Sequence, residues 1–216
     1  MSDHLRYFVL PLEEVIVFPH AMLRLEMAHM RFENEIEQAM SQGEQILVVG
    51  YHKSEEGSQG PVGINSLPLI GTLCKVKQVM KSPEGQKTIL MEGVQRGLVD
   101  TYFKQDDDTI MASVMPWPSQ AETSEQDFIA MDRLLERFRF LSKNNNKYPA
   151  GLVKELLIVK DPSRFSDMLA NYLQVDFSEK LQILEATATD KRLLLLNVLI
   201  EKIIQRKELE NYIVQQ

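Results

Sequence analysis

Hydrophobic and polar positions follow two different periods along the chain. Before about residue 118, apolar residues form short runs such as QILVVGY (45–51) or alternate with polar ones, as in TLCKVKQVM (72–80), which predicts β-strands. After that point they recur every three to four residues, which predicts helices. The pattern therefore predicts an α+β fold, with a strand-rich domain over residues 1–118 and a helical bundle over residues 119–216.

The segment FVLPLEEVIVFPH (8–20) has the composition of a strand but is interrupted several times. Pro11 and Pro19 lack an N–H group and belong at strand edges, bulges or ends. Glu13 and Glu14 divide the apolar run into FVLPL and VIVF. We predict two short extended pieces that bend and change neighbouring strands near the two glutamates, as at the corner of a small barrel.

One helix is predicted among the strands. RFENEIEQAMSQG places Phe32, Ile36, Ala39 and Met40 on one face, and Gly43 is suited to end the helix. AMLRLEM alternates and predicts a strand before this helix. Further on, KSPEGQK has the residues of a turn and joins TLCKVKQVM to TILMEGVQRGLV in a predicted hairpin. The two glycines inside the second strand predict bulges or sharp curvature.

The second half of the sequence carries clear signals for helix boundaries. PWPSQAETSEQ (116–126) is predicted to be a linker, and Ser124 is suited to cap the helix that follows. Asp161 before Pro162 predicts the start of another helix, and Ser178 is predicted to cap EKLQILEA. In the first of these helices the side chains predicted to face inward are Phe128, Met131, Leu135, Phe138 and Leu141.

Charge and composition exclude several classes of partner. The formal charge is −7, and residues 1–118 contain 10 basic and 16 acidic side chains. Phosphate backbones require a basic footprint, so nucleic acid is not expected as a partner. No run of about 18 apolar residues exists, so no membrane span is predicted. The single cysteine, Cys74, lies in an alternating run, which favours a packed thiol and a reducing, cytoplasmic location.

Sequence patterns of common catalytic sites are absent. The chain contains no G-x-x-x-x-G-K-[ST], H-E-x-x-H, C-x-x-C or G-x-S-x-G. His4, His20, His29 and His52 share no metal-ligand spacing. We therefore expect no catalytic residues, no metal and no cofactor, and we predict that the chain is not an enzyme.

Methionine is frequent, with eleven residues, and Met22, Met27, Met30 and Met40 fall around the predicted first helix. Methionine side chains fill irregular gaps in cores, which is the ordinary explanation. They also suit surfaces that accept many partners. On this second interpretation, Met22, Met27, Met30 and Phe32 form a groove for exposed apolar stretches of client proteins.

Four sequence blocks follow the order of one protein family. LPLEEVIVFPHAMLRLEM fits the pattern LPLRD-x-VVFPH-x-x-x-PL-x-V, and IGTLCKVKQVMKSPEGQKTILMEGVQRGLV fits G-T-x-A-x-I…V-L-V-E-G-x-x-R. DPSRFSDMLANYL fits D-P-x-x-L-A-D-x-I-A, and EKLQILEATATDKRLLLL fits K-Q-x-L-L-E-x-x-D-x-x-E-R-L. Over nearly its whole length, the chain therefore resembles the N-terminal domain of Lon, the family of ATP-dependent proteases.

The resemblance implies a compact, PUA-like β-barrel or pseudobarrel followed by a helical bundle. In this family the region recognises substrates and helps hexamer assembly, while separate ATPase and Ser–Lys protease domains come after it. We therefore expect that the chain alone neither hydrolyses ATP nor cuts peptides. The chain departs from the family pattern beside the first helix. Arg24 replaces a proline, Glu14 replaces the usual aspartate, and AHMR replaces a Gly-Arg pair, which bears on the clients recognised.

The leading hypothesis is a non-catalytic domain that binds unfolded or degron-bearing proteins for a Lon-type protease. Two alternatives stay open: a stand-alone regulator or adaptor with the same fold, and a PUA-like RNA-binding module, which the acidic charge disfavours. The last helix carries the apolar residues Leu209, Tyr212, Ile213 and Val214 near its end, so we expect self-association through it. The sequence leaves open whether the chain is a fragment or a stand-alone protein.

Overall fold

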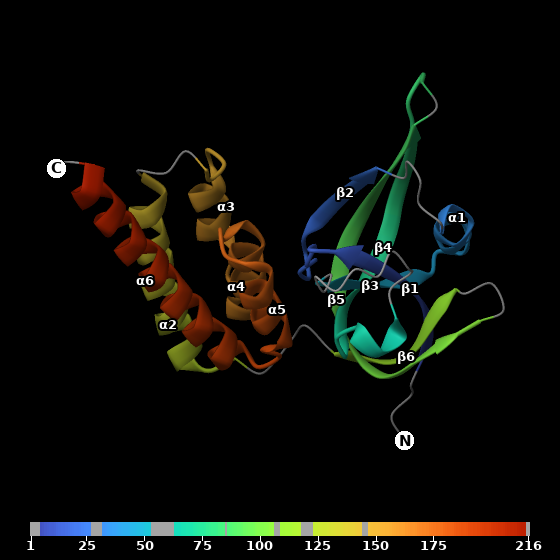
Figure 1. The fold of residues 1–216 in the computed structure, drawn as a ribbon. Helices are drawn as coiled ribbons and strands as arrows, with labels where there is room; N and C mark the ends of the chain where they lie inside the picture. Colours follow the sequence, from blue (N-terminus) through green and yellow to red (C-terminus); the bar gives the residue numbers. More distant parts are fainter. Residues whose placement is uncertain are drawn as a thin grey trace. The chain divides into compact units, whose positions relative to one another are not determined.

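The computed structural model describes residues 5–26, 32–52, 63–84, 86–105, 109–117, 123–143 and 147–214, with side chains up to residue 209. The chain divides into two compact units, Met1–Ser119 and Gln120–Gln216. Strands dominate the first and helices the second, so the fold is mixed α+β (Figure 1). We call them the β unit and the helical unit.

The described part of the β unit contains one sheet, one α-helix and a short 3-10 helix. Its elements are β1 (Leu5–Glu13), β2 (Met22–Glu26), α1 (Glu33–Gln42), β3 (Gln45–Tyr51), η1 (Ile64–Ser66), β4 (Ile70–Lys81), β5 (Lys87–Lys104) and β6 (Ile110–Trp117). The strand order is β2-β5-β4-β3-β1-β6, and β5 also pairs with β6. Five strands thus form a closed cycle of pairings, and β2 is attached outside the cycle through β5.

β1 accommodates a proline because its two halves have different neighbours. Leu5–Phe8 pairs antiparallel with β6, and Val9–Glu13 pairs parallel with β3. Pro11 lies in the second half, where only β3 pairs with β1, so one side of Pro11 has no ladder to break. The strand ends at Glu13, and the next residue, Glu14, has a φ of 58°. The bend predicted near the glutamates is therefore confirmed, although the change of neighbour comes earlier.

Residues 18–21 form a tight turn that leads into β2. The Ala21 N–H donates to the Phe18 carbonyl at 3.1 Å, and His20 has a φ of 66°. These are features of a type II turn, in which proline suits the first central position and a positive φ is required at the second. The His20 N–H donates to the Gly93 carbonyl at 2.8 Å, and the Gly93 N–H donates to the Ala21 carbonyl at 2.9 Å. Two residues of the turn therefore oppose one residue of β5, which is a β-bulge.

Gly93 is required by this turn. A Cβ atom at this position would lie 2.3 Å from the Phe18 carbonyl oxygen. The register between β4 and β5 also shifts here, between Leu73 and Cys74. The irregularity predicted from the glycines of β5 is confirmed at this glycine.

The run Val15–Phe18, predicted as an extended piece of strand, joins no ladder. Its residues pass between β1 and β2 as irregular chain, and Ile16, Val17 and Phe18 are buried. The Thr72 hydroxyl donates to the Val17 carbonyl at 2.6 Å. Packing and this side-chain hydrogen bond hold the run in place instead of strand pairing.

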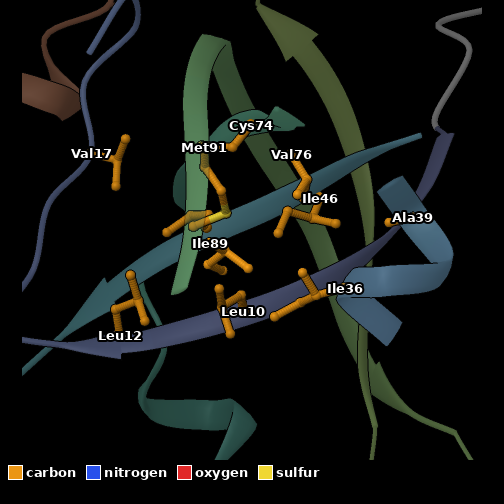
Figure 2. Packing of buried hydrophobic residues seen from close by; sticks show 11 residues of the cluster. Leu10, Leu12, Val17, Ile36, Ala39, Ile46, Cys74, Val76, Ile89 and Met91 are labelled. Carbon is orange, nitrogen blue, oxygen red and sulfur yellow. The ribbon is translucent and has the colours of Figure 1, made fainter. Parts of the chain in front are cut away.

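Two apolar clusters fill the β unit. The first cluster joins Ile36 and Ala39 of α1 to side chains of the sheet that include Leu10 and Met91 (Figure 2). We call it the α1 cluster. Successive residues of β3 alternate between the two clusters, so that Ile46 belongs to the α1 cluster and Leu47 to the other. Both faces of β3 are therefore buried, which explains its unbroken apolar sequence.

The helical unit consists of five helices among its described residues. They are α2 (Glu125–Lys143), α3 (Leu152–Ile158), α4 (Pro162–Tyr172), α5 (Phe177–Glu185) and α6 (Thr189–Val214). The predicted helices after Ser124, after Asp161 and over EKLQILEA correspond to α2, α4 and α5, and the predicted last helix corresponds to α6. No helix within the described ranges combines the length and apolar character needed to cross a bilayer.

Two predicted helix caps are confirmed. The Asp161 carboxylate accepts the Arg164 N–H at 2.7 Å, and Pro162 follows at the first helical position. Before α2, the Ser124 hydroxyl accepts the Asp127 N–H at 3.3 Å. The Asp127 carboxylate in turn accepts the Ser124 N–H at 2.7 Å, which makes the contact reciprocal.

Two predictions in this unit are wrong. Ser178 does not cap α5, because the helix begins one residue earlier and Asp176 forms a capping box with Glu179. Phe128 does not face inward, and its side chain is 41% exposed. The first inward position of α2 is taken by Asp127, which is buried because it serves as a cap.

A buried arginine organises the helical unit. Arg192 of α6 and Asp167 of α4 are fully buried, and the Arg192 Nε lies 3.2 Å from the Asp167 Oδ1. Arg192 also donates to the Ser166 and Ser163 hydroxyls, each at 2.7 Å, and to the Ala186 carbonyl at 2.7 Å. These contacts tie α4, α6 and the connection before α6 to one side chain.

Candidate functional site

α1 is fixed on the sheet by apolar and ionic contacts. Ile36 and Ala39 are buried in the α1 cluster. Lys87, the first residue of β5, pairs with Glu33 and also with Glu37, at 2.7 Å from Nζ to Oε1. Hydrogen bonds to the carboxylates raise the pKa of Lys87, with Glu33 as the larger cause and Glu37 as the second. This ammonium group therefore stays charged at neutral pH.

An open groove of about 1100 Å³ lies beside α1. We call it the α1 groove. It is bordered by α1 and the turn after it, by the first half of β1, and by residues at both ends of β6. Its lining includes Phe8, Glu35, Gln38, Glu44, Gln105 and Met111.

The lining of the α1 groove combines amide, acidic and apolar groups. Gln38 and Gln105 each present a carbonyl oxygen and an NH₂ group, so they can accept from and donate to a peptide backbone. Phe8 and Met111 provide apolar, partly buried surface. The Thr109 hydroxyl donates to the Glu35 carboxylate at 3.4 Å. This arrangement can hold an extended polypeptide by contact.

The residues predicted for client binding lie in different places. Met22 lies on β2 with 52% of its side chain exposed. Phe32 precedes α1, packs edge to face on Phe8 at 5.5 Å between ring centroids, and borders the α1 cluster. Met27 and Met30 lie outside the described residues. Phe32 therefore packs against Phe8, which lines the α1 groove. Met22 belongs to β2, the strand outside the closed cycle of pairings.

Sequence reasoning did not find the polar residues of the α1 groove. Gln38 and Gln105 are far apart in the sequence and carry no motif. They line one groove because β6 pairs with β1 beside α1. A scan for glutamine on the exposed face of the predicted helix would have found Gln38 only.

Among the described residues, side chains with intrinsic reactivity form neither an accessible thiol nor a metal-binding group. Cys74 is fully buried, and this burial raises the pKa of its thiol, so the predicted packed and unreactive thiol is consistent with its position. Across the described ranges, no group of three or more His, Cys, Asp or Glu residues could hold a metal ion.

The helical unit has a smaller groove of about 590 Å³ between α2 and α6. The buried part of its lining consists of Asp127, Leu134, Thr189 and Leu193. Arg133, Arg137 and Leu194 are exposed. The Arg137 guanidinium lies 3.0 Å from the Glu201 carboxylate. This groove is more apolar and carries fewer amide groups than the α1 groove.

Residues 6–202 match the family model described as the ATP-dependent protease La (LON) substrate-binding domain. The chain belongs to this family. The match covers strands and helices of both units. The resemblance drawn from the four sequence blocks is therefore confirmed.

Full-length relatives of this Lon domain are much longer than the chain. It is 32% identical to the Lon protease of Xanthomonas oryzae pv. oryzae, over 95% of the chain and 24% of that protein. It is 26% identical to the Lon protease of Escherichia coli K12, over 98% of the chain and 26% of that protein. The chain thus spans about a quarter of the length of these curated relatives.

Solved structures of Lon N-terminal domains share the fold. The N-terminal domain of the Mycobacterium avium complex Lon protease aligns with a TM-score of 0.71 and 18% identity, over 91% of the chain and 98% of that domain. The Lon N-terminal domain protein of Xanthomonas campestris aligns with a TM-score of 0.66 and 14% identity, over 90% of the chain and 98% of that protein. At these identities the likeness concerns the fold alone.

Proposed function

We propose that this chain is a non-catalytic substrate-recognition domain of a Lon-type ATP-dependent protease, which binds unfolded or degron-bearing proteins. The observation that carries the proposal is the α1 groove, an open channel whose amide and apolar groups suit a peptide backbone and its side chains. The family description supports the same assignment. In this proposal the protein works in the cytoplasm and binds the client. ATP hydrolysis and peptide cleavage belong to other parts of a full-length Lon protease.

The proposed mechanism is reversible capture. The α1 groove is open to solvent and its lining mixes acidic, amide and apolar groups, so it offers no deep pocket for a single anchor residue. We expect weak binding at one site, with avidity arising when several copies of the domain engage one client. Weak single sites also release clients for translocation.

The finer description of the β unit is part of the proposal. We infer a PUA-like, barrel-shaped domain, which is supported by the closed cycle of pairings among β5, β4, β3, β1 and β6. The lining of the α1 groove includes two acidic side chains, Glu35 and Glu44, and one basic side chain, Arg6. This balance favours a protein client over RNA, whose phosphates require a basic surface.

Self-association through α6 is a further part of the proposal. Of the four residues that the sequence indicates for this contact, Leu209 is exposed, and the side chains of Tyr212, Ile213 and Val214 lie outside the described part of the structure. Leu194 and Val198 of the same helix are also exposed. Sedimentation equilibrium of the chain should detect oligomers that dissociate when Leu194 and Val198 are both replaced by glutamate. A monomer at high concentration of the unaltered chain would remove this part of the proposal.

Blocking the α1 groove provides the test. Gln38→Cys places one reactive thiol in the groove, and Asn34→Cys places one on α1 at a residue that does not line it. Buried Cys74 should not compete for a maleimide reagent. We expect a bulky maleimide on Gln38→Cys to weaken binding of fluorescein-labelled β-casein, an unfolded protein, at least tenfold. The same label on Asn34→Cys should leave binding unchanged, and equal binding by both adducts would remove the α1 groove from the proposal.

Met27 and Met30 remain proposed client contacts. Peptide arrays of unfolded proteins should bind the wild-type chain better than the double variant Met27→Asp/Met30→Asp, because a carboxylate is costly to desolvate against apolar side chains. Equal binding would exclude these two residues and leave the groove test unaffected.

A further inference from the structure

β2 has one free edge. In the part of the chain that the structure describes, β5 is the only strand that pairs with β2. The Gly93 N–H donates to the Ala21 carbonyl, which makes these two residues a hydrogen-bonded pair of the antiparallel ladder. Because such pairs alternate along a ladder, the backbone groups of Leu23 and Leu25 face β5.

The backbone groups of Met22, Arg24 and Glu26 consequently face away from the sheet. Among the described residues, none forms a backbone hydrogen bond with these three outside the β5 ladder. A row of unpaired N–H and C=O groups is the template on which another extended chain adds as a strand. The edge offers three such residues, spaced two apart.

Side chains of β2 indicate what kind of strand would fit. Leu23 and Leu25 pack against the α1 cluster but are only partly buried. A strand added outside β2 would place alternate side chains beside these leucines and extend their burial. On the other face, its side chains would lie beside the exposed Met22 and Arg24. The matching segment has apolar residues at alternate positions and an acidic residue opposite Arg24.

A second copy of the chain is a poorer match for the same edge. Antiparallel pairing of β2 with β2 over its full length would be centred on Arg24 and would place Arg24 directly opposite Arg24. Like charges in directly opposite positions are destabilising. Charge therefore favours a client segment over self-pairing.

We propose that the free edge of β2 captures an extended segment of an unfolded client by strand addition, with apolar residues at alternate positions and an acidic residue facing Arg24. This inference rests on the proposed function and assigns part of client recognition to the backbone. Strand pairing through the backbone depends more on the extended conformation of the client than on its side chains. This property suits a domain that must accept many unfolded sequences.

Residue-resolved hydrogen exchange by NMR tests the proposal on the full chain. Without client, the amides of Leu23 and Leu25 should exchange slowly and those of Met22, Arg24 and Glu26 quickly. Saturating unfolded β-casein should slow the three outward amides at least tenfold. Casein that binds, as fluorescence anisotropy would show, without slowing these amides would overturn the inference and leave the proposed function standing. No casein binding would overturn both.

A matched pair of variants separates the backbone from the side chain. Arg24→Ala removes the charge and keeps the outward N–H, whereas Arg24→Pro removes the N–H as well. Proline is tolerated on the free side of an edge strand, so both variants should keep the wild-type unfolding midpoint. We expect Arg24→Pro to bind β-casein roughly tenfold more weakly than Arg24→Ala. Equal affinities of the two variants for β-casein would overturn client capture at this edge. So would slower exchange of the three outward amides when the concentration of the chain is raised without casein, because that result would indicate self-pairing.

Discussion

The two units of this Lon domain differ in where they place their polar groups. In its described part, the β unit buries two apolar clusters and presents polar groups at its margins, as amide and acidic side chains in the α1 groove and as outward-facing backbone groups on the free edge of β2. The helical unit buries a charged group at its centre, and Arg192 there is bonded to a carboxylate, two hydroxyls and a carbonyl. Saturated polar groups hold a structure, whereas unsaturated ones at a surface are available to a partner.

The largest predicted effect comes from the buried charge. Arg192→Met should destabilise the helical unit by about 3–5 kcal/mol, because it leaves Asp167 buried without its cation. Denaturant titration followed by far-UV circular dichroism measures the loss. Fluorescence of Trp117, the single tryptophan, should keep its wild-type midpoint because it reports the β unit.

An exposed arginine of the same unit is the matched control. Arg137→Met breaks the pair with Glu201, whose side chain is 46% exposed, and should cost less than about 1 kcal/mol. If both variants lost the same stability, burial of the Arg192 contacts would not be what makes them important.

The next effect comes from the close approach between Gly93 and the turn at residues 18–21. Gly93→Ala should destabilise the β unit by about 3 kcal/mol, because its Cβ would overlap the Phe18 carbonyl and neither backbone can move freely. Gly63→Ala is the control, since nothing lies within 4 Å of a Cβ built at that position. Trp117 fluorescence during denaturation compares the two, and a shift in Gly63→Ala equal to that of Gly93→Ala would contradict the account.

A smaller effect separates the observed cap of α5 from the predicted one. Asp176→Ala should cost about 1 kcal/mol, because it removes the capping box with Glu179. Ser178→Ala should change the free energy of unfolding by less than about 0.5 kcal/mol. Thermal unfolding of both variants decides between the caps, and the reverse order would restore Ser178.

The smallest predicted effect depends on pH. The hydrogen bond from Lys202 lowers the pKa of Glu179 below the usual value of a glutamate. The pair therefore stabilises the folded chain fully above the unfolded pKa of about 4.3, and this contribution is lost as the pH falls through the lower folded pKa. The free energies of unfolding of wild type and Lys202→Met should converge in that acidic window. A constant difference between them down to the lowest pH would disprove the linkage.

Local patterns predicted most elements of the fold. Alternation and short apolar runs gave β2, β3 and the β4–β5 hairpin, and the caps at Ser124 and Asp161 are where the sequence placed them. These features depend on neighbouring residues alone. Phe128 was misplaced because a buried cap, Asp127, displaced the apolar stripe of α2, which periodicity does not register.

The candidate sites depended on long-range pairing and were harder to predict. The α1 groove forms because β1 changes partners partway along its length and places Phe8 near β6. The free edge of β2 follows from a strand order in which β5 has partners on both sides and β2 has one. Methionine content drew attention to Met22, which does lie on that edge, but it gave no sign of the backbone groups beside it.

Crosslinking of the full chain to unfolded β-casein, followed by mapping of the linked residues, tests the central claim most directly. The account predicts links to residues of α1, β1 and β2, from a chain that leaves casein uncut and ATP unhydrolysed. Links confined to the helical unit, or casein cleavage or nucleotide turnover by the purified chain, would contradict it.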